Sequence, residues 1–268
     1  MYPIVNKSVV ITGSTRGIGY SLAEAFLERG CAVAVSGRTQ AAVDEALAKL
    51  GSIYSRELTF GLPCDVTDFA QLQDLWESAK SHFDRIDIWI NNAGLAVPMT
   101  NFWELSTEQY RALVQTNILG VMYGSKVALR GMLAQGFGAL YNMEGYGARG
   151  GNMRGMTVYG STKAAIHFMN RSLAVETAGT PIITGAIAPG MVITDLVTRQ
   201  FDGRLEELEK ARPILNIIAE RAETVAPVLV DKILKNQKNG ASIRYTSPVK
   251  MMGKFLTAPF KKRDLFTT

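Results

Sequence analysis

The chain has 268 residues, 47% hydrophobic and 20% charged, which is the composition of a globular protein with a filled core. Its net charge of +5 is uneven: residues 230–268 hold nine basic and two acidic side chains, which leaves the preceding part near −2 and gives no reason to expect a nucleic-acid partner. No apolar run reaches the roughly 20 residues that span a membrane, and the first residues lack the basic and apolar regions of a signal peptide, so neither a membrane-spanning helix nor secretion is expected.

Strand-like and helix-like patterns alternate along the chain. Apolar runs predict strands at residues 8–12, 32–36, 58–64, 86–91, 138–143, 182–187 and 242–246. Helical patterns cover residues 17–30, 41–50, 69–83, 107–135, 158–177 and 217–234. Strands separated by helices of this length indicate parallel βαβ units with helices on both faces of the sheet. With no linker or repeat to divide it, the chain 1–268 is predicted to be a single Rossmann-like, doubly wound α/β domain.

The first predicted strand runs into a glycine-rich turn that opens the first helix. Small residues let the backbone turn tightly and approach a pyrophosphate, while the helix N-terminus offers free N–H groups and a partial positive charge. The residues of this turn predicted to bind a dinucleotide are Gly13, Ser14, Thr15, Arg16, Gly17, Ile18 and Gly19. Glycines at this spacing are a weak signal alone, and their place between a strand and a helix strengthens it.

The end of the second strand, Ser36-Gly37-Arg38, bears on the choice of cofactor. A site for NAD usually carries an acidic residue there to hold the ribose 2′-hydroxyl. This chain has none and offers Arg38 and Arg16, whose guanidinium groups suit a 2′-phosphate. NADPH is therefore the predicted cofactor. The alternative for Arg38 is a solvated surface charge.

Two further strand ends are predicted to line the cofactor crevice. Asp65 and Val66 follow the third strand, where the Asp65 side chain would meet the adenine edge. The fourth strand is followed by Asn92, Ala93 and Gly94. Because open parallel sheets bind ligands outside the carboxyl ends of their strands, both assignments rest on strand position.

Tyr159 and Lys163 stand four residues apart on a predicted helix, so their side chains share one face. A phenol with its ordinary pKa of about 10 is a poor acid–base group at neutral pH, and a nearby ammonium is expected to lower that pKa. Tyr159 would then protonate a carbonyl oxygen as hydride arrives, and Lys163 would also bind the nicotinamide ribose. Without the other motifs, a surface tyrosine and lysine on a helix would be the preferred interpretation of this pair.

Six motifs follow one another in order: TGSTRGIG, CDV at 64–66, NNAG, Asn117 within QTNILG, YGSTK and PGMVIT at 189–194. In this order they resemble the short-chain dehydrogenases/reductases over about residues 5–195. The resemblance implies that Asn117 holds a water in the proton relay and that Thr194 contacts the nicotinamide amide. Further cofactor contacts are implied at Pro189, Gly190 and Val192. A homodimer or tetramer packed partly through the long helices is also implied.

One departure from that family concerns catalysis. The family normally has a serine some 13 residues before the catalytic tyrosine, where it polarises the carbonyl. Counting from Asn142 puts this position at Gly145, and counting back from Tyr159 puts it at Tyr146. Losing one such donor can cost about 10²–10³ in rate. Either the Tyr146 hydroxyl or a backbone N–H near Gly145 substitutes, or the protein is a weak or inactive reductase.

A narrower resemblance explains the missing serine. NMEGYGARGG, VYGSTKAA, PGMVITDL and LNIIAERAETVAPVLV are similar to the chlorophyll b reductases, a branch that carries an NM-acid-G sequence in place of the usual serines. The resemblance implies NADPH-dependent reduction of the C7 formyl group of a chlorophyll-type tetrapyrrole to hydroxymethyl. The alternatives are a carbonyl reductase for another bulky apolar ketone or aldehyde, and a catalytically silent NADP(H)-binding regulatory protein.

The segments around the predicted site suit a large, flat, hydrophobic substrate. Glycines remove side-chain bulk beside it; they are Gly145, Gly147, Gly150, Gly151 and Gly155. Residues 196–215, after the sixth strand, are predicted to be a substrate lid, the alternative being a loop unrelated to ligand size. The basic tail, residues 247–268, interleaves apolar residues with lysines, which suits peripheral contact with an anionic membrane. The alternatives for the tail are solvation or a subunit contact.

The cysteines and histidines add little chemistry. Cys31 and Cys64 are predicted to be reduced, buried thiols. His82 and His167 lie far apart without metal-ligand spacing, so no metal site is predicted. These features favour an intracellular, soluble protein, in the cytoplasm, or in the plastid stroma and peripheral to the thylakoid membrane if a transit peptide has been removed.

Overall fold

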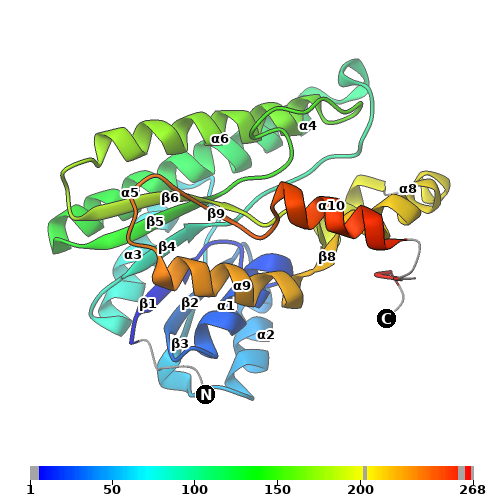
Figure 1. Ribbon diagram of the computed structural model, residues 1–268. Coiled ribbons are helices and arrows are strands. Elements are labelled where there is room, and N and C mark those ends of the chain that lie inside the picture. The colour runs from blue at the N-terminus through cyan, green and yellow to red at the C-terminus, as the bar shows by residue number, and fades with distance from the viewer. Residues whose placement is uncertain (1–5, 202–203, 259–262, 267–268) are drawn as a thin grey trace.

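Seven parallel strands form the central sheet of the computed structural model, which describes residues 6–201, 204–258 and 263–266 (Figure 1). Their order is β3-β2-β1-β4-β5-β6-β9. The strands are β1 (Ser8–Ile11), β2 (Ala32–Gly37), β3 (Thr59–Pro63), β4 (Ile88–Asn91), β5 (Gly138–Met143), β6 (Ile182–Ala188) and β9 (Ala241–Arg244). Chain order reverses between β1 and β4, where Val9 pairs with both Val33 and Ile88. The predicted doubly wound α/β fold is therefore confirmed, and this reversal is where such sheets bind their ligands.

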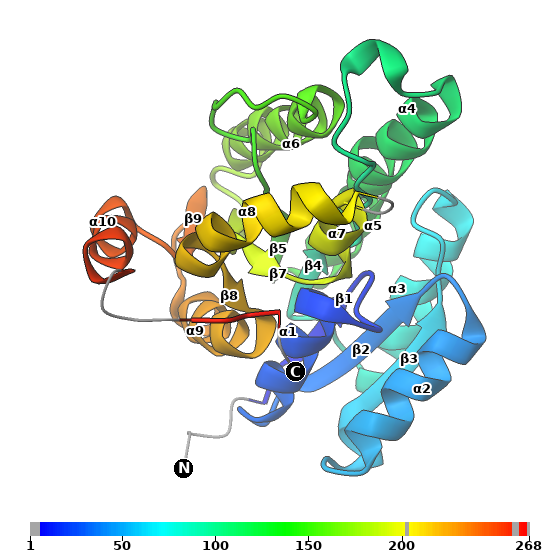
Figure 2. The same cartoon turned by 90° about the vertical axis from the view of Figure 1, so that its right-hand side faces the viewer.

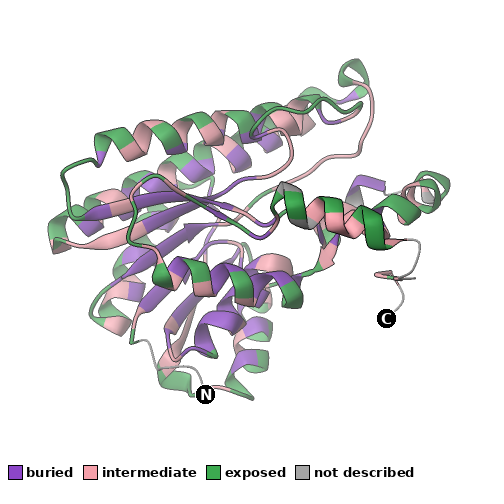
Figure 3. Ribbon diagram, in the orientation of Figure 1, coloured by how far each residue is buried: buried purple, intermediate pink, exposed green. Residues whose placement is uncertain are grey.

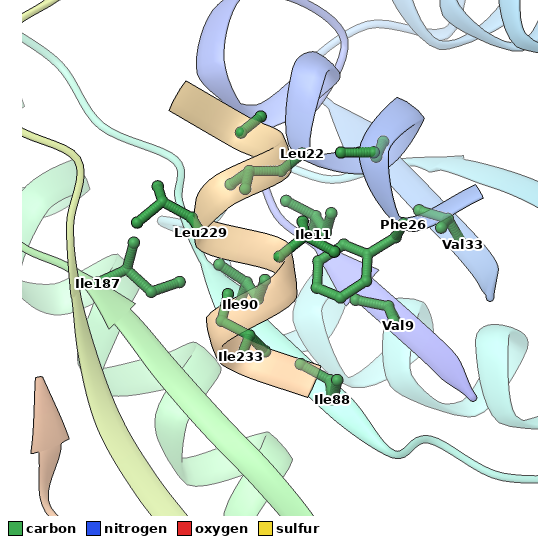
Figure 4. Packing of buried hydrophobic residues seen from close by; sticks show 14 of the residues in the cluster. Val9, Ile11, Leu22, Phe26, Val33, Ile88, Ile90, Ile187, Leu229 and Ile233 are labelled. Carbon is green, nitrogen blue, oxygen red and sulfur yellow. The ribbon is translucent and has the colours of Figure 1, made fainter. Parts of the chain in front are cut away.

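Helices cover both faces of the sheet. The elements on one face are α1 (Gly17–Leu27), α2 (Gln40–Gly51) and α9 (Ala222–Lys235), and those on the other are α3 (Phe69–Phe83), α5 (Gly120–Gln135) and α6 (Thr157–Glu176). Figure 4 shows Phe26 of α1 and Leu229 of α9 pointing towards strand residues such as Ile11. All three are fully buried, and each such side chain contributes about 1.5–3 kcal/mol of apolar burial. Figure 3 shows the buried strands between helices whose outer faces are exposed.

Local signals explain where several helices begin and end. The Asp68 carboxylate accepts hydrogen bonds from the amides of Ala70 and Gln71 and so caps the start of α3. Helix α5 ends at Gly136, whose φ of 83° suits glycine.

Two predicted helices differ from the structure. The helix predicted at 107–135 is α4 (Thr107–Val114), a π turn (Gln115–Leu119) and α5. The helix predicted at 217–234 begins only at Ala222. The preceding residues Glu220–Arg221 form β8, which pairs with β7 (Val192–Ile193) and cannot continue a helix.

The predicted lid and tail are largely helical. After β7 come α7 (Asp195–Thr198), a 3-10 turn (Arg199–Phe201) and α8 (Leu205–Ile218), so the predicted lid 196–215 is not an open loop; residues 202–203 lie outside the described residues. Figure 2 faces the edge where the strands end and shows α7 and α8 across it. In the tail, α10 spans Pro248–Thr257, while residues 259–262 and 267–268 are not described. None of the described helices is long and apolar enough to cross a membrane.

Candidate active site

The glycine-rich turn packs directly against the end of β4. The Asn92 side chain donates hydrogen bonds to the carbonyls of Thr12 and Gly13, both at 2.9 Å. A Cβ on Gly13, whose φ is 62°, would lie 2.8 Å from Ala93 Cα, and one on Gly19 would lie 2.4 Å from Asn92 Nδ2. These glycines are therefore required by close packing at the point where chain order reverses.

Ser14 belongs to the scaffold of this turn. Its buried hydroxyl donates to the Ile11 carbonyl at 2.6 Å and accepts from the Ser36 amide at 3.0 Å, while its own amide donates to the Ser36 carbonyl. The side chain ties β1 to β2. The predicted cofactor contact of Ser14 is thus not supported, because its donors are used within the fold.

Two other residues predicted to bind the cofactor, Thr15 and Ile18, pack against neighbouring elements. A Cβ on Gly37 would lie 2.6 Å from Thr15 Cγ2, so Thr15 sits against the end of β2. Ile18, in the first turn of α1, is partly buried against the core.

The two arginines predicted to bind a 2′-phosphate lie in different surroundings. Arg38 is exposed and has no ion-pair or hydrogen-bond partner among the described residues. Arg16 lies 3.4 Å from Asp195 of α7, with both side chains more than half exposed. Exposed pairs of this kind are worth about 1 kcal/mol or less, so Arg16 remains available to a stronger anion.

At the end of β3, one carboxylate oxygen of Asp65 accepts from the Thr67 amide at 2.9 Å and the Thr67 hydroxyl at 2.8 Å. The other oxygen has no hydrogen-bond donor among the described residues. Val66 is buried, and a Cβ on Gly120 would lie 2.7 Å from its Cγ2. Val66 thus packs against the start of α5, and one carboxylate oxygen of Asp65 is left without a donor among the described residues.

Tyr159, Lys163 and Asn117 come together at the carboxyl end of β4 and β5. The Lys163 side chain is 4% exposed, its Nζ donates to the Met143 carbonyl at 3.1 Å, and it lies 5.8 Å from the centre of the Tyr159 ring. A Cβ on Gly94 would lie 3.7 Å from Asn117 Oδ1 and 3.9 Å from Lys163 Nζ. The Tyr159 hydroxyl has no hydrogen-bond partner among the described residues, which leaves it open to a ligand.

The Asn117 side chain bonds to the chain after β4 and to α6. Its Oδ1 accepts from the Leu95 amide at 2.8 Å, and its Nδ2 donates to the Leu95 carbonyl at 2.9 Å and to Thr162 Oγ1 at 3.2 Å. Both amide hydrogens are therefore used, while Oδ1 can accept a second hydrogen bond. The π turn that carries Asn117 has i→i+5 hydrogen bonds, and such turns are frequent at functional sites.

Burial sets the acid–base behaviour of the pair. It raises the pKa of Tyr159 to about 12 and lowers the pKa of Lys163 to about 8, with the negative charge of Glu144 opposing the effect on Lys163. The expectation that the ammonium lowers the pKa of Tyr159 is contradicted, because removal from water outweighs the charge of Lys163. At neutral pH the phenol is protonated, which is the form that donates to a carbonyl.

Gly145, not Tyr146, lies beside the Tyr159 hydroxyl. A Cβ on Gly145 would lie 2.6 Å from the Tyr159 hydroxyl oxygen and 3.3 Å from Lys163 Cε. The Tyr146 hydroxyl lies beside Gly151, 3.4 Å from a Cβ placed there. Of the two ways to count the position of the missing serine, the one from Asn142 agrees with the geometry.

A charged residue that sequence reasoning treated only as part of a motif lies next to this site. Glu144 follows β5 directly and is 3% exposed. One oxygen lies 2.8 Å from His167 Nδ1 and the other 3.2 Å from Arg149 Nε, and Arg149 also donates to Ser242 Oγ at 2.9 Å. In the sequence, an acidic residue directly after an apolar strand could have marked Glu144 as a site residue. Its pairing with His167 and Arg149 depends on the tertiary structure and could not be read from the sequence.

Segments on the substrate side meet around Met99, in the chain after β4. The Met99 amide donates to the Gln200 carbonyl at 3.2 Å, and Arg204 donates to the Met99 carbonyl. A Cβ on Gly155, whose φ is 79°, would lie 2.8 Å from the Met99 carbonyl carbon. Met99, in the loop after β4, thus contacts both the α7–α8 segment and the glycine-rich loop before α6.

The remaining predicted contacts follow β6. A Cβ on Gly17 would lie 3.4 Å from Thr194 Cγ2, so Thr194 faces the start of α1 across the crevice. Val192 is buried in β7, and Gly190, with a φ of 80°, turns the chain after Pro189. Cys31 and Cys64 are buried free thiols, as predicted, and burial raises their pKa values to about 11 and about 12.

Residues 7–205 match the family model for short chain dehydrogenase. Chlorophyll(ide) b reductase NOL, chloroplastic, from Arabidopsis thaliana is 33% identical over 259 residues, 93% of this chain and 73% of that protein. Probable chlorophyll(ide) b reductase NYC1 from Oryza sativa subsp. japonica is 32% identical, and the chain spans about half of it, 52%. A 3alpha-hydroxysteroid dehydrogenase from Mediterraneibacter gnavus is 33% identical over 78% of this chain and 83% of its own. Among solved structures, the closed form of serine dehydrogenase complexed with NADP+ superposes with a TM-score of 0.79, at 27% identity, over 90% of this chain and 95% of that one.

Proposed function

The chain belongs to the short-chain dehydrogenase family, and on that premise we propose that it is an NADPH-dependent reductase of the C7 formyl group of a chlorophyll b-type tetrapyrrole. The observation that carries the chemistry is the open hydroxyl of Tyr159 beside Gly145 and Lys163. The substrate class is supported by the chlorophyll(ide) b reductases among the relatives and by the NM-acid-G sequence that replaces the usual serine.

The carboxyl edge of the sheet suits a nicotinamide dinucleotide. The glycine-rich turn opens α1 where chain order reverses, so the N-terminus of that helix can meet a pyrophosphate. Two buried polar atoms there, Ser36 Oγ and Asn92 Oδ1, lack a hydrogen-bond partner among the described residues. Buried polar groups are normally paired, so these atoms suit a ligand with polar groups of its own.

A 2′-phosphate is favoured over a free ribose hydroxyl. Arg38 is exposed and unpaired among the described residues, and Arg16 is held only by an exposed ion pair. Guanidinium groups bind phosphate through parallel hydrogen bonds. We therefore assign the preference for NADPH to Arg38, with Arg16 as a second contact.

Proton transfer follows from the groups around Tyr159. The bound cofactor supplies the hydride that adds to the formyl carbon. Tyr159, protonated at neutral pH, gives its proton to the formyl oxygen, so the aldehyde becomes an alcohol. Lys163 stabilises the resulting phenolate and returns a proton to it, and we assign to Asn117, on the same side of Gly94, the water that relays a proton to Lys163.

Backbone N–H groups are the proposed replacement for the serine. Neither the Gly145 nor the Tyr146 amide donates a hydrogen bond within the part of the chain that the structure describes. Gly145 lies beside the Tyr159 hydroxyl, so we place the carbonyl oxygen between that hydroxyl and these amides. Preorganised N–H groups of this kind stabilise developing negative charge.

The substrate lid and the subunit contact are further parts of the proposal. We assign the lid to α7 and α8, which lie across the edge where the strands end (Figure 2). Exposed apolar side chains on the α4–α6 face, among them Met122, Leu133, Phe168 and Val175, support a homo-oligomer packed through these helices. In the tail, Lys254 and Arg263 both pair with Glu220, so part of the basic charge expected to meet a membrane is used within the chain.

The test is turnover of chlorophyllide b by the purified protein with NADPH or NADH, with Tyr159→Phe as the matched variant. The pigment absorbance reports loss of the formyl group. We expect conversion with NADPH by the wild type only. Because a 3alpha-hydroxysteroid dehydrogenase is also a relative, a bulky steroid ketone is the second substrate. NADPH binding without reaction of the pigment would refute the tetrapyrrole assignment, and reaction of the ketone alone would replace it.

A further inference from the structure

Glu144 carries its charge out of contact with water beside the reaction centre. We call Glu144, Arg149, His167 and Ser242 the Glu144 cluster. Both carboxylate oxygens are paired, one with His167 of α6 and one with Arg149 of the glycine-rich loop, which in turn holds Ser242 of β9. A buried carboxylate is costly to fold around unless it is paired in this way. We therefore looked for an effect of this charge on the neighbouring groups.

Geometry links this cluster to Lys163. Tyr159, Lys163 and His167 are spaced four residues apart on α6, so their side chains lie along one face of that helix. The Lys163 ammonium donates to the carbonyl of Met143, the residue immediately before Glu144, while the carboxylate of Glu144 holds His167 one turn further along. The negative charge thus lies next to the buried ammonium without forming an ion pair with it.

The cluster also holds the loop that faces Tyr159. The Glu144 amide donates to the Ile187 carbonyl at 2.8 Å, and its side chain binds Arg149 across the turn that contains Gly145 and Tyr146. These two residues carry the amides assigned above to the carbonyl oxygen. Removing the carboxylate would free that turn as well as remove a charge.

We propose that Glu144 is a positioning residue that keeps Lys163 protonated and holds the Gly145–Tyr146 turn against the Tyr159 hydroxyl. This inference deepens the proposed function and rests on it for the identity of the reaction. Three titratable or charged side chains of the described residues face the Glu144 carboxylate. Arg149 faces it from the loop, and His167 and Lys163 face it from α6, whereas Ser242 of β9 is neutral.

The sign of the effect follows from these charges. Burial lowers the pKa of Lys163 to about 8, and the carboxylate of Glu144 opposes that effect. Without the negative charge the ammonium is less stable, so Lys163 loses its proton at a lower pH. His167 contacts one oxygen of this carboxylate and Arg149 the other, so the effect of the negative charge is tested with both partners in place.

The experiment measures the protonation of Lys163 directly, with ¹³C-lysine-labelled protein and NMR. The Lys163 signal is assigned by its loss in Lys163→Met. In Glu144→Gln we expect its titration midpoint to fall by about one pH unit, the size of effect that a nearby opposite charge produces. Glu144→Asp keeps the charge and should retain most of the wild-type midpoint. His167→Gln keeps the Glu144 carboxylate and should do the same. Exposed Glu57→Gln is the matched control.

The activity readout is kept separate. If the pigment is turned over, the alkaline limb of kcat/KM should move with the Lys163 midpoint in Glu144→Gln. An unchanged midpoint in a folded Glu144→Gln would overturn the inference whatever the activity, and so would equal shifts in Glu144→Gln and His167→Gln, which indicate a structural role alone. If Glu144→Gln does not fold, Arg149→Gln decides the same question: it removes the cation that offsets Glu144, so the Lys163 midpoint should rise, and an unchanged midpoint would overturn the inference. Failure of pigment turnover in the wild type would refute the proposed substrate while leaving the titration interpretable.

Discussion

Gly145 lies so close to the Tyr159 hydroxyl that no larger residue fits at this position without a shift. Its replacement by alanine therefore tests the geometry of the proposed site. A Cβ there would lie 2.6 Å from the Tyr159 hydroxyl oxygen, whereas ordinary contacts begin at 3.4 Å. The oxygen must therefore move by about 0.8 Å, and Lys163 Cε and Cγ, each 3.3 Å from the same Cβ, crowd the neighbouring space. A misplacement near 1 Å at a catalytic group can cost about 100-fold in rate.

We therefore expect Gly145→Ala to lower kcat by about 100-fold and to affect NADPH binding much less, since the atoms nearest the new Cβ belong to Tyr159 and Lys163 and not to the glycine-rich turn. Gly145→Ser should lose activity for the same reason, although serine is the residue that the family normally has near this place. The assay is the loss of NADPH absorbance with chlorophyllide b, together with NADPH fluorescence titration. Gly51→Ala is the control, because a Cβ there meets nothing within 4 Å. A Gly145→Ser variant as active as the wild type, or more active, would refute this geometry.

Three further outcomes follow from the same structure. Arg38→Ser should weaken NADPH binding by about 10- to 100-fold, as the loss of a charge-assisted hydrogen bond implies, and leave NADH binding unchanged; equal losses for both cofactors in fluorescence titrations would argue against a 2′-phosphate contact. Leu229→Ala, in the core between α9 and the sheet, should lower the free energy of unfolding by about 2–5 kcal/mol in urea titrations, and a change below 1 kcal/mol would contradict that packing. Activity should be present below pH 8 and decline as pH rises through about 8, the pKa of the buried Lys163, because the ammonium is lost there; a kcat/KM profile that stays flat beyond this pH would exclude that role.

Local pattern was enough for most of the fold. The strand from Ser8, the helix from Phe69 and their neighbours lie within a residue or two of their predicted ranges, because apolar periodicity and glycine or aspartate at element ends act over a few residues. The two departures come from contacts that a periodicity cannot contain. Apolar spacing continues smoothly through Asn117, but its side chain bonds to Leu95, 22 residues away, inside a π turn. Glu220 likewise leaves the helical pattern to pair with Val192.

The amino-acid sequence by itself determined the family, the doubly wound sheet and the set of residues near the crevice, since strand ends of a parallel sheet meet at one edge whatever the details of packing. Only the tertiary structure decided what each of these groups can do. It turned Ser14 inward, put Gly145 rather than Tyr146 against the Tyr159 hydroxyl, and paired Glu144 with His167. Burial then reversed the expected direction of the Tyr159 pKa. Desolvation and ion pairing depend on which surfaces face one another in space, and spacing along a chain does not specify that.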